Sequence, residues 1–256
     1  MHHLHQPFLR TYARTGLRSK GQTLSATGSS SHTSTGDPHH SSAGQPLSLS
    51  QIDDVHVLDL DSVATKTIMQ HLETMAHHCY TLGSPRTDLL LHLIQLNLTK
   101  SLMENTRILG LTSEDLHDDA LSPFNTAGPW PYNFGFDEQS LPPSLRPTQI
   151  QRTVPHHPWL DLLPAAQMRD NLIHAGESFD EERLCLDIKG WGSVRTGNTG
   201  IIVWKDPWDA AGWEVSEAFA RNWGWVLWGC ENLFRSTNYW RAQRGERPLF
   251  RTSNQT

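Results

Sequence analysis

Apolar residues recur over residues 61–81 at steps of three and four, which is the spacing of one face of an α-helix. The stripe consists of Ile68, Leu72, Met75 and Cys79. A second helix is predicted over residues 86–108. It is apolar over most of its circumference, so we expect it at the centre of the fold. Its expected boundary residues are Ser84 and Pro85 at the start and Gly110 at the end.

The second half of the chain is less regular. Residues 119–147 are rich in Pro, Gly and aromatic residues, which favours an irregular wrap over the core. Its aromatic residues are Phe124, Trp130, Tyr132, Phe134 and Phe136. One helix is predicted to begin at Pro164, and another at the capping-box spacing of Ser178 and Glu181 and to end at Gly190. Residues 192–200 indicate a turn, and residues 201–204 a strand. A helical face is predicted from Val215 to Leu233, split near Gly224 and Gly229.

These elements predict a mainly α fold. We expect a single compact helical domain over residues 60–250, with at most a small β element near residues 199–204. Residues 1–55 hold Ser, Thr, Gly and His without apolar periodicity, which is typical of a disordered tail. All ten Trp residues lie after Leu121, so the core is expected in the C-terminal two thirds.

Charge is divided unevenly along the chain. Residues 1–50 carry four basic residues and one acidic residue, whereas the remainder carries 17 basic and 26 acidic side chains. A net-acidic body is a poor non-specific binder of nucleic acid, because phosphate neutralisation supplies most of that affinity. The three cysteines are widely spaced and odd in number, which favours a reducing compartment.

Targeting signals are weak. No apolar run reaches the length of a membrane span, and no secretory signal is expected. Residues 8–20 (FLRTYARTGLRSK) place Arg10, Arg14 and Arg18 four apart, a composition that suits a mitochondrial presequence. A basic tail is favoured instead, because the apolar partners of an amphipathic face are few.

Leucine-zipper spacing occurs at the start of the second predicted helix. Leu82, Leu89, Leu96 and Met103 are seven residues apart. A basic leucine zipper requires a basic helix just before it, and the preceding twenty residues hold only Lys66 as a basic side chain apart from His. Residues 86–108 are therefore interpreted as a core helix.

Two short motifs offer candidate chemistry. In PHHPW, His156, His157 and Asp161 could form part of a metal or catalytic site, but none has a recognised ligand spacing. In DPWD, Asp206 and Asp209 could act as an acid–base pair, or could simply start a turn and cap a helix. No catalytic residue, cofactor or metal is predicted. Candidate pocket residues are His156, His157, Trp159, Asp161, Asp206, Trp208, Asp209, Trp213, Asn238 and Trp240.

Arginines and aromatic residues alternate near the end of the chain, in residues 233–251. Arg235, Arg241, Arg244 and Arg247, with Arg251 beyond them, are candidate anion contacts, since arginine and aromatic rings can bind phosphate and stack on bases. The competing interpretation is that these arginines pair with the acidic body and pack on tryptophan.

Residues 89–249 resemble a fungal family of unknown function that is found C-terminal to the basic leucine zipper of fungal transcription factors. The resemblance is carried, in order, by LIQLNLTKSLMENTRILGL (93–111), SPFN (122–125), LPPSLRPTQIQ (141–151), PHHPWLDLLP (155–164), RDNLI (169–173), FDEERLCLDIKG (179–190), GIIVWKDPWDAAGWEVSEAFARNWGW (200–225) and GCENLFRSTNYWRAQRGERPL (229–249). It implies a nuclear regulatory context, with cytoplasm as the alternative and the mitochondrion least favoured. It implies no catalytic residue. The sequence departs from the full pattern in having no basic region or zipper.

Three functional hypotheses follow. The first is a non-enzymatic regulatory or interaction domain with a protein partner, such as the transcription machinery or a basic-leucine-zipper protein. The second is an enzyme or a metal- or small-molecule-binding protein, which requires the PHHPW and DPWD side chains to converge on one concave site. The third is direct nucleic-acid binding through Arg235–Arg251, which requires a contiguous positive face and a partly exposed Trp240.

Overall fold

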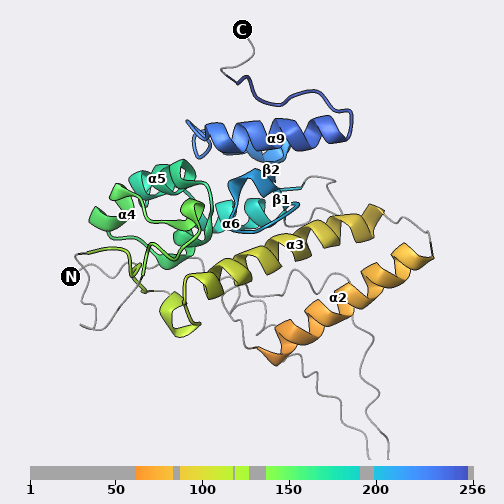
Figure 1. The fold of residues 1–256 in the computed structure, drawn as a ribbon, viewed down its shortest axis with the longest axis horizontal. Coiled ribbons are helices and arrows are strands. Elements are labelled where there is room, and N and C mark those ends of the chain that lie inside the picture. Colours follow the sequence, from red (N-terminus) through yellow and green to blue (C-terminus); the bar gives the residue numbers. More distant parts are fainter. Residues whose placement is uncertain (1–61, 83–86, 118, 127–136, 191–198, 253–256) are drawn as a thin grey trace, which may run out of the picture.

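The computed structural model describes residues 62–82, 87–117, 119–126, 137–190 and 199–252, and this part of the chain is mainly helical (Figure 1). Its α-helices are α2 (Val63–Thr81), α3 (Thr87–Ile108), α4 (Gln149–Thr153), α5 (Ala166–Ala175), α6 (Glu181–Lys189), α8 (Glu217–Asn222) and α9 (Glu231–Gln243). Short 3-10 turns are η2 (Glu114–Leu116), η3 (Pro143–Leu145), η4 (Pro158–Leu162) and η5 (Ala210–Gly212). The two strands are β1 (Ile201–Val203) and β2 (Trp213–Val215). The predicted mainly α class with a small β element is confirmed.

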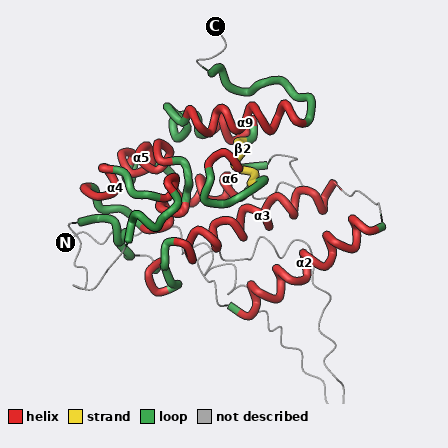
Figure 2. The backbone as a smooth tube through the Cα atoms, in the orientation of Figure 1, coloured by secondary structure: helices red, strands yellow, loops and turns green. Residues whose placement is uncertain are grey.

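Helix α3 lies at the centre of the fold. It packs against α2 on one side and against β1, α6 and η4 on the other, and α9 covers the hairpin through β2 and η5 (Figures 1 and 2). Leu98 of α3 and Leu109, just after its end, belong to the main hydrophobic core, whereas Leu96 and Met103 pack towards α2. This two-sided burial explains why the sequence of α3 is apolar almost all round.

The end of α3 follows the sequence prediction. Gly110 has φ of +67°, a left-handed conformation that glycine adopts without a steric penalty. The amides of Gly110 and Leu111 donate to the carbonyls of Arg107 and Thr106, each at 3.0 Å, which makes a Schellman end. The heptad spacing is not a zipper: Leu82 lies outside the helix and is 66% exposed, and Leu96 faces α2 of the same chain.

Helix α2 is attached through a small separate cluster. Met69 and Leu72 of α2 meet Leu96 and Met103 of α3, with Ile68 and Leu93 at the margin. A salt bridge joins Glu73 to Lys100 beside this cluster. Of the predicted stripe, Leu72 is buried, Ile68 and Met75 are half-buried, and the side chain of Cys79 lies outside the described residues.

Replacing Leu72 by alanine is expected to release α2 while leaving the rest of the fold in place. Leu72 is almost fully buried, and deleting such a side chain costs about 2–5 kcal/mol. Because the cluster is separate from the main core, amide hydrogen exchange should rise by about a hundredfold or more in α2 and stay unchanged in β1. Val63→Ala is the matched control, since Val63 is exposed. Uniform acceleration across the chain would contradict a separately attached α2.

The hairpin consists of the predicted strand and a partner that the sequence did not reveal. β1 pairs antiparallel with β2 in the register Ile201↔Val215, Ile202↔Glu214 and Val203↔Trp213. Val215 was predicted at the start of a helical face and instead ends this strand. Every residue of the pair is buried, because α3 and α9 cover the hairpin. The Val215 amide donates to the Thr237 hydroxyl of α9 at 3.1 Å.

Several predicted helix boundaries are corrected. Asp180, not Ser178, caps α6, because its carboxylate accepts from the Arg183 amide at 2.9 Å. Helix α5 starts at Ala166, two residues after the predicted Pro164. The split near Gly224 and Gly229 is confirmed, since α8 ends at Asn222 and α9 begins at Glu231.

Other sequence predictions lie wholly or partly outside the described residues. They are the tail of residues 1–55, the helix start at Ser84 and Pro85, most of the turn at residues 192–200, and the wrap aromatics Trp130, Tyr132, Phe134 and Phe136. Phe124, the described member of that set, is buried in the core. No helix in the described segments is long and apolar enough to cross a membrane.

Candidate functional site

The PHHPW motif forms a rigid, buried corner. The Nδ1 atom of His157 accepts from the Trp159 amide at 3.2 Å and so caps η4, while its Nε2 lies 2.9 Å from the carbonyl oxygen of His117. Pro158 occupies the first turn of η4, where no amide donor is needed. His156, His157 and Asp161 are all buried. The predicted local bonds are present at Val154 for His156 and at Trp159 for His157, but His157 also contacts His117, 40 residues earlier.

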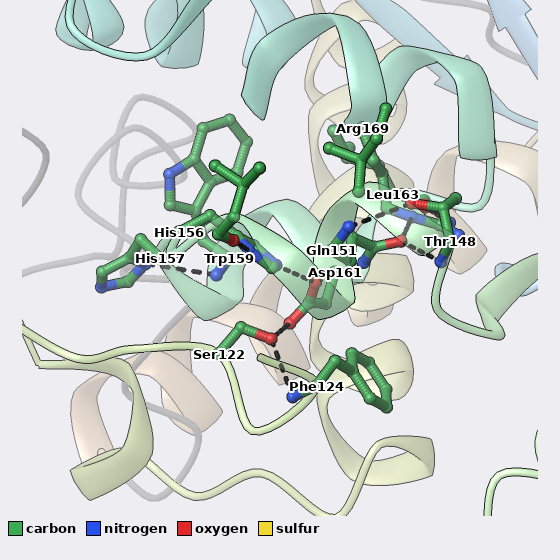
Figure 3. Close-up of polar contacts among 12 residues, drawn as sticks. Ser122, Phe124, Thr148, Gln151, His156, His157, Trp159, Asp161, Leu163 and Arg169 are labelled. Carbon is green, nitrogen blue, oxygen red and sulfur yellow. Dashed lines mark hydrogen bonds and ion pairs between the residues drawn. The ribbon is translucent and has the colours of Figure 1, made fainter. Parts of the chain in front are cut away.

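Asp161 is the hub of a buried polar network (Figure 3). Its Oδ2 accepts from the Ser122 hydroxyl at 2.6 Å, and its Oδ1 accepts from the Gln151 amide at 2.5 Å and faces His156 Nε2 at 3.0 Å. His156 Nδ1 lies 2.8 Å from the Val154 carbonyl oxygen. Both ring nitrogens of His156 therefore face oxygen atoms.

Arg169 of α5 completes the network. Its guanidinium donates to Gln151 Oε1 at 2.9 Å and to the backbone carbonyls of Ser144, Leu163 and Arg146 at 2.8, 2.5 and 2.8 Å. The side chain is wholly buried, and burial lowers its pKa to about 10, with Asp161 and Asp170 acting in the opposite direction. At neutral pH the guanidinium is still charged, and it joins the backbone of residues 144–146 to that of Leu163.

The hydrogen bonds around Asp161 differ from those of a catalytic triad. In a nucleophilic triad the histidine accepts the serine proton, whereas here Ser122 donates to the aspartate and its oxygen accepts from the Phe124 amide at 3.1 Å. Ser122 and Asp161 are buried, so neither is presented to a substrate. The network instead joins the 122–125 loop, α4, η4 and α5.

The sequence did not reveal three members of this network, namely Ser122, Gln151 and Arg169. One signal was present: Thr148 and Gln151 have capping-box spacing, and they do form a capping box at the start of α4. The Thr148 hydroxyl also donates to Asp170 Oδ1 at 2.5 Å, which ties α4 to α5.

The DPWD motif lies in the turn of the hairpin. Asp209 caps η5 by accepting from the Ala211 amide at 2.9 Å, as the competing interpretation predicted. Asn105 of α3 donates to the carbonyls of Leu162 and Pro207 at 2.8 and 2.9 Å, so it fixes this turn beside η4.

The two aspartates of the DPWD motif are exposed, whereas the two histidines of the PHHPW motif are buried. Asp206 and Asp209 are exposed and line an open groove of about 480 Å³ beside α9. His156, His157 and Asp161 point into the buried network instead. The five side chains do not converge on one concave site, so the condition for the enzyme hypothesis is not met.

The other candidate pocket residues form hydrogen bonds or packing contacts within the fold. Trp159 donates to Glu181 at 2.5 Å, and burial raises the pKa of this carboxyl while that hydrogen bond acts against the rise. Trp213 is buried and donates to the Pro207 carbonyl at 3.0 Å, and Trp208 packs against the core. Asn238 holds the C-terminal segment against α9 through the backbone of residues 249 and 250.

Two tryptophan rings, with a cationic side chain over each, stack beside the open groove that Asp206 and Asp209 line. The rings of Trp204 and Trp240 stack with centroids 5.6 Å apart, Lys205 lies 5.5 Å from the Trp240 centroid, and Arg244 lies 5.3 Å from that of Trp204. Buried Glu214 receives a bidentate contact from Arg244 at 2.9 and 2.5 Å. The hydrogen bond from Arg244 to Glu214, and a second one to Glu246, raise the pKa of Arg244.

The other C-terminal arginines are placed differently. Arg241 lies 3.3 Å from Glu246 and donates to the Arg247 carbonyl, and exposed Arg235 donates to Asn232 at 2.6 Å. Arg247 and Arg251 are exposed, and Trp240 is half-buried. Arg241 and Arg244 thus pair with the chain's own carboxylates, as the competing interpretation predicted.

A further surface feature was missed by the sequence analysis, which placed the Trp-rich segment in the core. On residues 223–229, here called the tryptophan turn, Trp223 is buried but Trp225 is 39% and Trp228 80% exposed. The Trp225 ring packs against Phe179 and Trp223, with centroids 5.4 and 6.2 Å apart. Asn171 of α5 donates to the carbonyls of residues 225, 226 and 228 at 3.4, 2.9 and 2.8 Å. The turn therefore presents two tryptophans from a fixed backbone.

Reactive groups are scarce in the described part of the chain. No three or more His, Cys, Asp or Glu side chains are grouped there so as to hold a metal ion. Burial raises the pKa of the Cys230 thiol to about 12 and also raises that of Cys185, which disfavours the nucleophilic thiolate at both positions.

Comparison with known families agrees with the motifs. Residues 130–233 match the family model described as a domain of unknown function, DUF3425. No match to the chain is found among curated proteins or solved structures. The matched stretch lies within residues 89–249, and it contains the PHHPW corner, the DPWD turn and the tryptophan turn. Residues 130–233, less than half of the chain, are therefore similar to the DUF3425 family, the domain associated with fungal basic-leucine-zipper transcription factors.

Proposed function

We propose that the chain is a non-enzymatic, nuclear regulatory protein of transcription-factor type, and that it binds a protein partner through the tryptophan turn. The observation that carries the proposal is Trp228, whose ring is 80% exposed although its backbone is clamped by Asn171. Tryptophan is enriched at the energetic centres of protein interfaces, and a preformed turn loses little entropy on binding.

Two further observations favour this function over catalysis. The candidate acid, base and nucleophile around Asp161 are buried and hydrogen-bonded to one another. The family context supplies the regulatory setting, since the matching domain is associated with transcription factors. The partner would be a component of the transcription machinery or a basic-leucine-zipper protein.

A tethering experiment tests the proposal. The full chain is fused to a heterologous DNA-binding domain in a fungal reporter strain, and we expect reporter output to change several-fold relative to the DNA-binding domain alone. Trp228→Ala, combined with Trp225→Ala, should abolish the change, because truncating an interface hot spot costs about 2–4 kcal/mol. Leu90→Ala, at another exposed apolar residue, is the control.

Each contrary outcome overturns a stated part of the proposal. An inert wild-type fusion that is stable and nuclear would contradict a regulatory role. An active fusion that is indifferent to the double tryptophan variant would exclude the tryptophan turn as the binding surface.

A further inference from the structure

A long groove runs beside the N-terminal part of α9. It consists of two adjoining hollows of about 460 and 480 Å³ that share Ser144, Ala210 and Asn232 as lining residues. We call it the α9 groove. It begins at Gly229, at the end of the tryptophan turn, and reaches Tyr239 and Trp240. Tyr239 is 51% exposed, so the far end of the groove offers an aromatic surface.

The charge of the α9 groove is mainly negative. Asp170 and Glu231 lie towards one end, and Asp206 and Asp209 towards the other. None of these four carboxylates forms a salt bridge with another described residue. The two cations of the lining already have contacts, since Lys205 lies over the Trp240 ring and Arg235 donates to Asn232.

The chain itself contains a segment of complementary chemistry. Residues 8–20 (FLRTYARTGLRSK) carry four cations and no acid, together with Phe8, Tyr12 and Leu17. On a helix, the stretch from Arg10 to Arg18 would measure ~12 Å, close to the ~12 Å of α9 between Glu231 and Tyr239. The chain between this segment and the described domain comprises residues 21–61. A chain of this length has a mean span of about 35 Å when it is unstructured, which corresponds to an effective concentration near millimolar for a segment that it tethers.

We propose that residues 8–20 dock in the α9 groove of their own chain through contacts of the arginines with its carboxylates. The docked segment would lie beside the tryptophan turn, since the groove begins at Gly229. The inference goes beyond the proposed function and does not depend on it, because the docking needs no partner.

The test uses a fluorescent peptide of residues 8–20 and full-length protein. In the tail variant, Arg10, Arg14 and Arg18 are all replaced by Glu, which removes the competing segment. We expect the peptide to bind the tail variant at least tenfold more tightly than it binds the wild-type chain, as measured by anisotropy at low salt. Binding should weaken as salt is raised.

A groove variant locates the site. Adding Asp206→Asn, Asp209→Asn and Glu231→Gln to the tail variant should weaken peptide binding at least tenfold, and Asn at position 209 can still cap η5. Adding Glu104→Gln and Glu114→Gln instead removes acidic charge elsewhere and should leave binding unchanged.

Three results would overturn the proposal. They are no peptide binding to the tail variant, equal binding to the wild-type and tail variants, and binding that ignores the groove substitutions. A wild-type chain whose sedimentation mass rises with concentration, and whose tail variant stays monomeric, would place the segment in the groove of a second copy and overturn docking within one chain.

Discussion

Replacing Arg169 by alanine is expected to lower the free energy of unfolding by about 3–5 kcal/mol, because it removes a buried charge whose partners stay buried. Four acceptors would each lose one donor, namely Gln151 Oε1, which keeps the Thr148 amide, and the carbonyls of Ser144, Arg146 and Leu163. Asp161 would also lose a nearby positive charge. Equilibrium unfolding in urea measures the change.

Arg169→Lys distinguishes the contribution of the positive charge from that of the planar shape of the guanidinium. It keeps the positive charge but has three donors at one point instead of a planar fork, so we expect it to recover less than half of the loss. Arg221→Ala is the control: Arg221 is exposed and pairs only with Glu217 four residues earlier, so its loss should stay below about 0.5 kcal/mol. A cost for Arg169→Ala as small as that of the control would contradict a structural role for the network.

The second large effect is expected at Gly200, where the backbone of β1 approaches the end of α6. A Cβ atom added at this position would lie 2.1 Å from the carbonyl oxygens of both Asp187 and Ile188. These are backbone atoms of α6 and are unable to rotate away, so Gly200→Ala should cost about 3 kcal/mol or more through overpacking.

Thermal and urea unfolding, with near-ultraviolet circular dichroism of the tryptophans, measure this effect. Gly224→Ala provides the graded comparison, since its Cβ would meet only the Ala220 carbonyl oxygen, at 3.2 Å. We expect a cost near 1 kcal/mol there. Equal costs at the two positions would mean that the close approach of Gly200 to α6 is not what fixes β1.

The parts of the fold that were predicted correctly depend on local chemistry. The apolar period of α2, the all-round apolar pattern of α3 and the glycine after α3 are each encoded within a few residues. Strand β2 was missed because its three residues carry little strand signal without β1 beside them. Val215 and Phe219 are four residues apart, the spacing of one helical face. In the structure Val215 ends β2, and Ser216 caps α8, the helix that contains Phe219.

In the candidate site, too, contacts between neighbouring residues were predicted and contacts between distant residues were not. Local bonding of the PHHPW histidines and capping by Asp209 followed from neighbouring residues. The role of Asp161 as a hub did not, because Ser122 reaches it from 39 residues away. The exposure of Trp228 was not predicted either, since tryptophan content alone favours burial, and the contact of Asn171 with the Trp228 carbonyl joins residues 57 positions apart.

We propose that the Asp161 network stabilises the fold, whereas the tryptophan turn carries the function. The most direct test measures reporter output per folded molecule for two tethered full-length variants, Asp161→Asn and the double Trp225→Ala/Trp228→Ala. We expect Asp161→Asn to lose stability but to keep its output per folded molecule at a permissive temperature, whereas the tryptophan variant keeps its stability and loses its output. A folded but silent Asp161→Asn variant, beside an active tryptophan variant, would instead place function at the buried network.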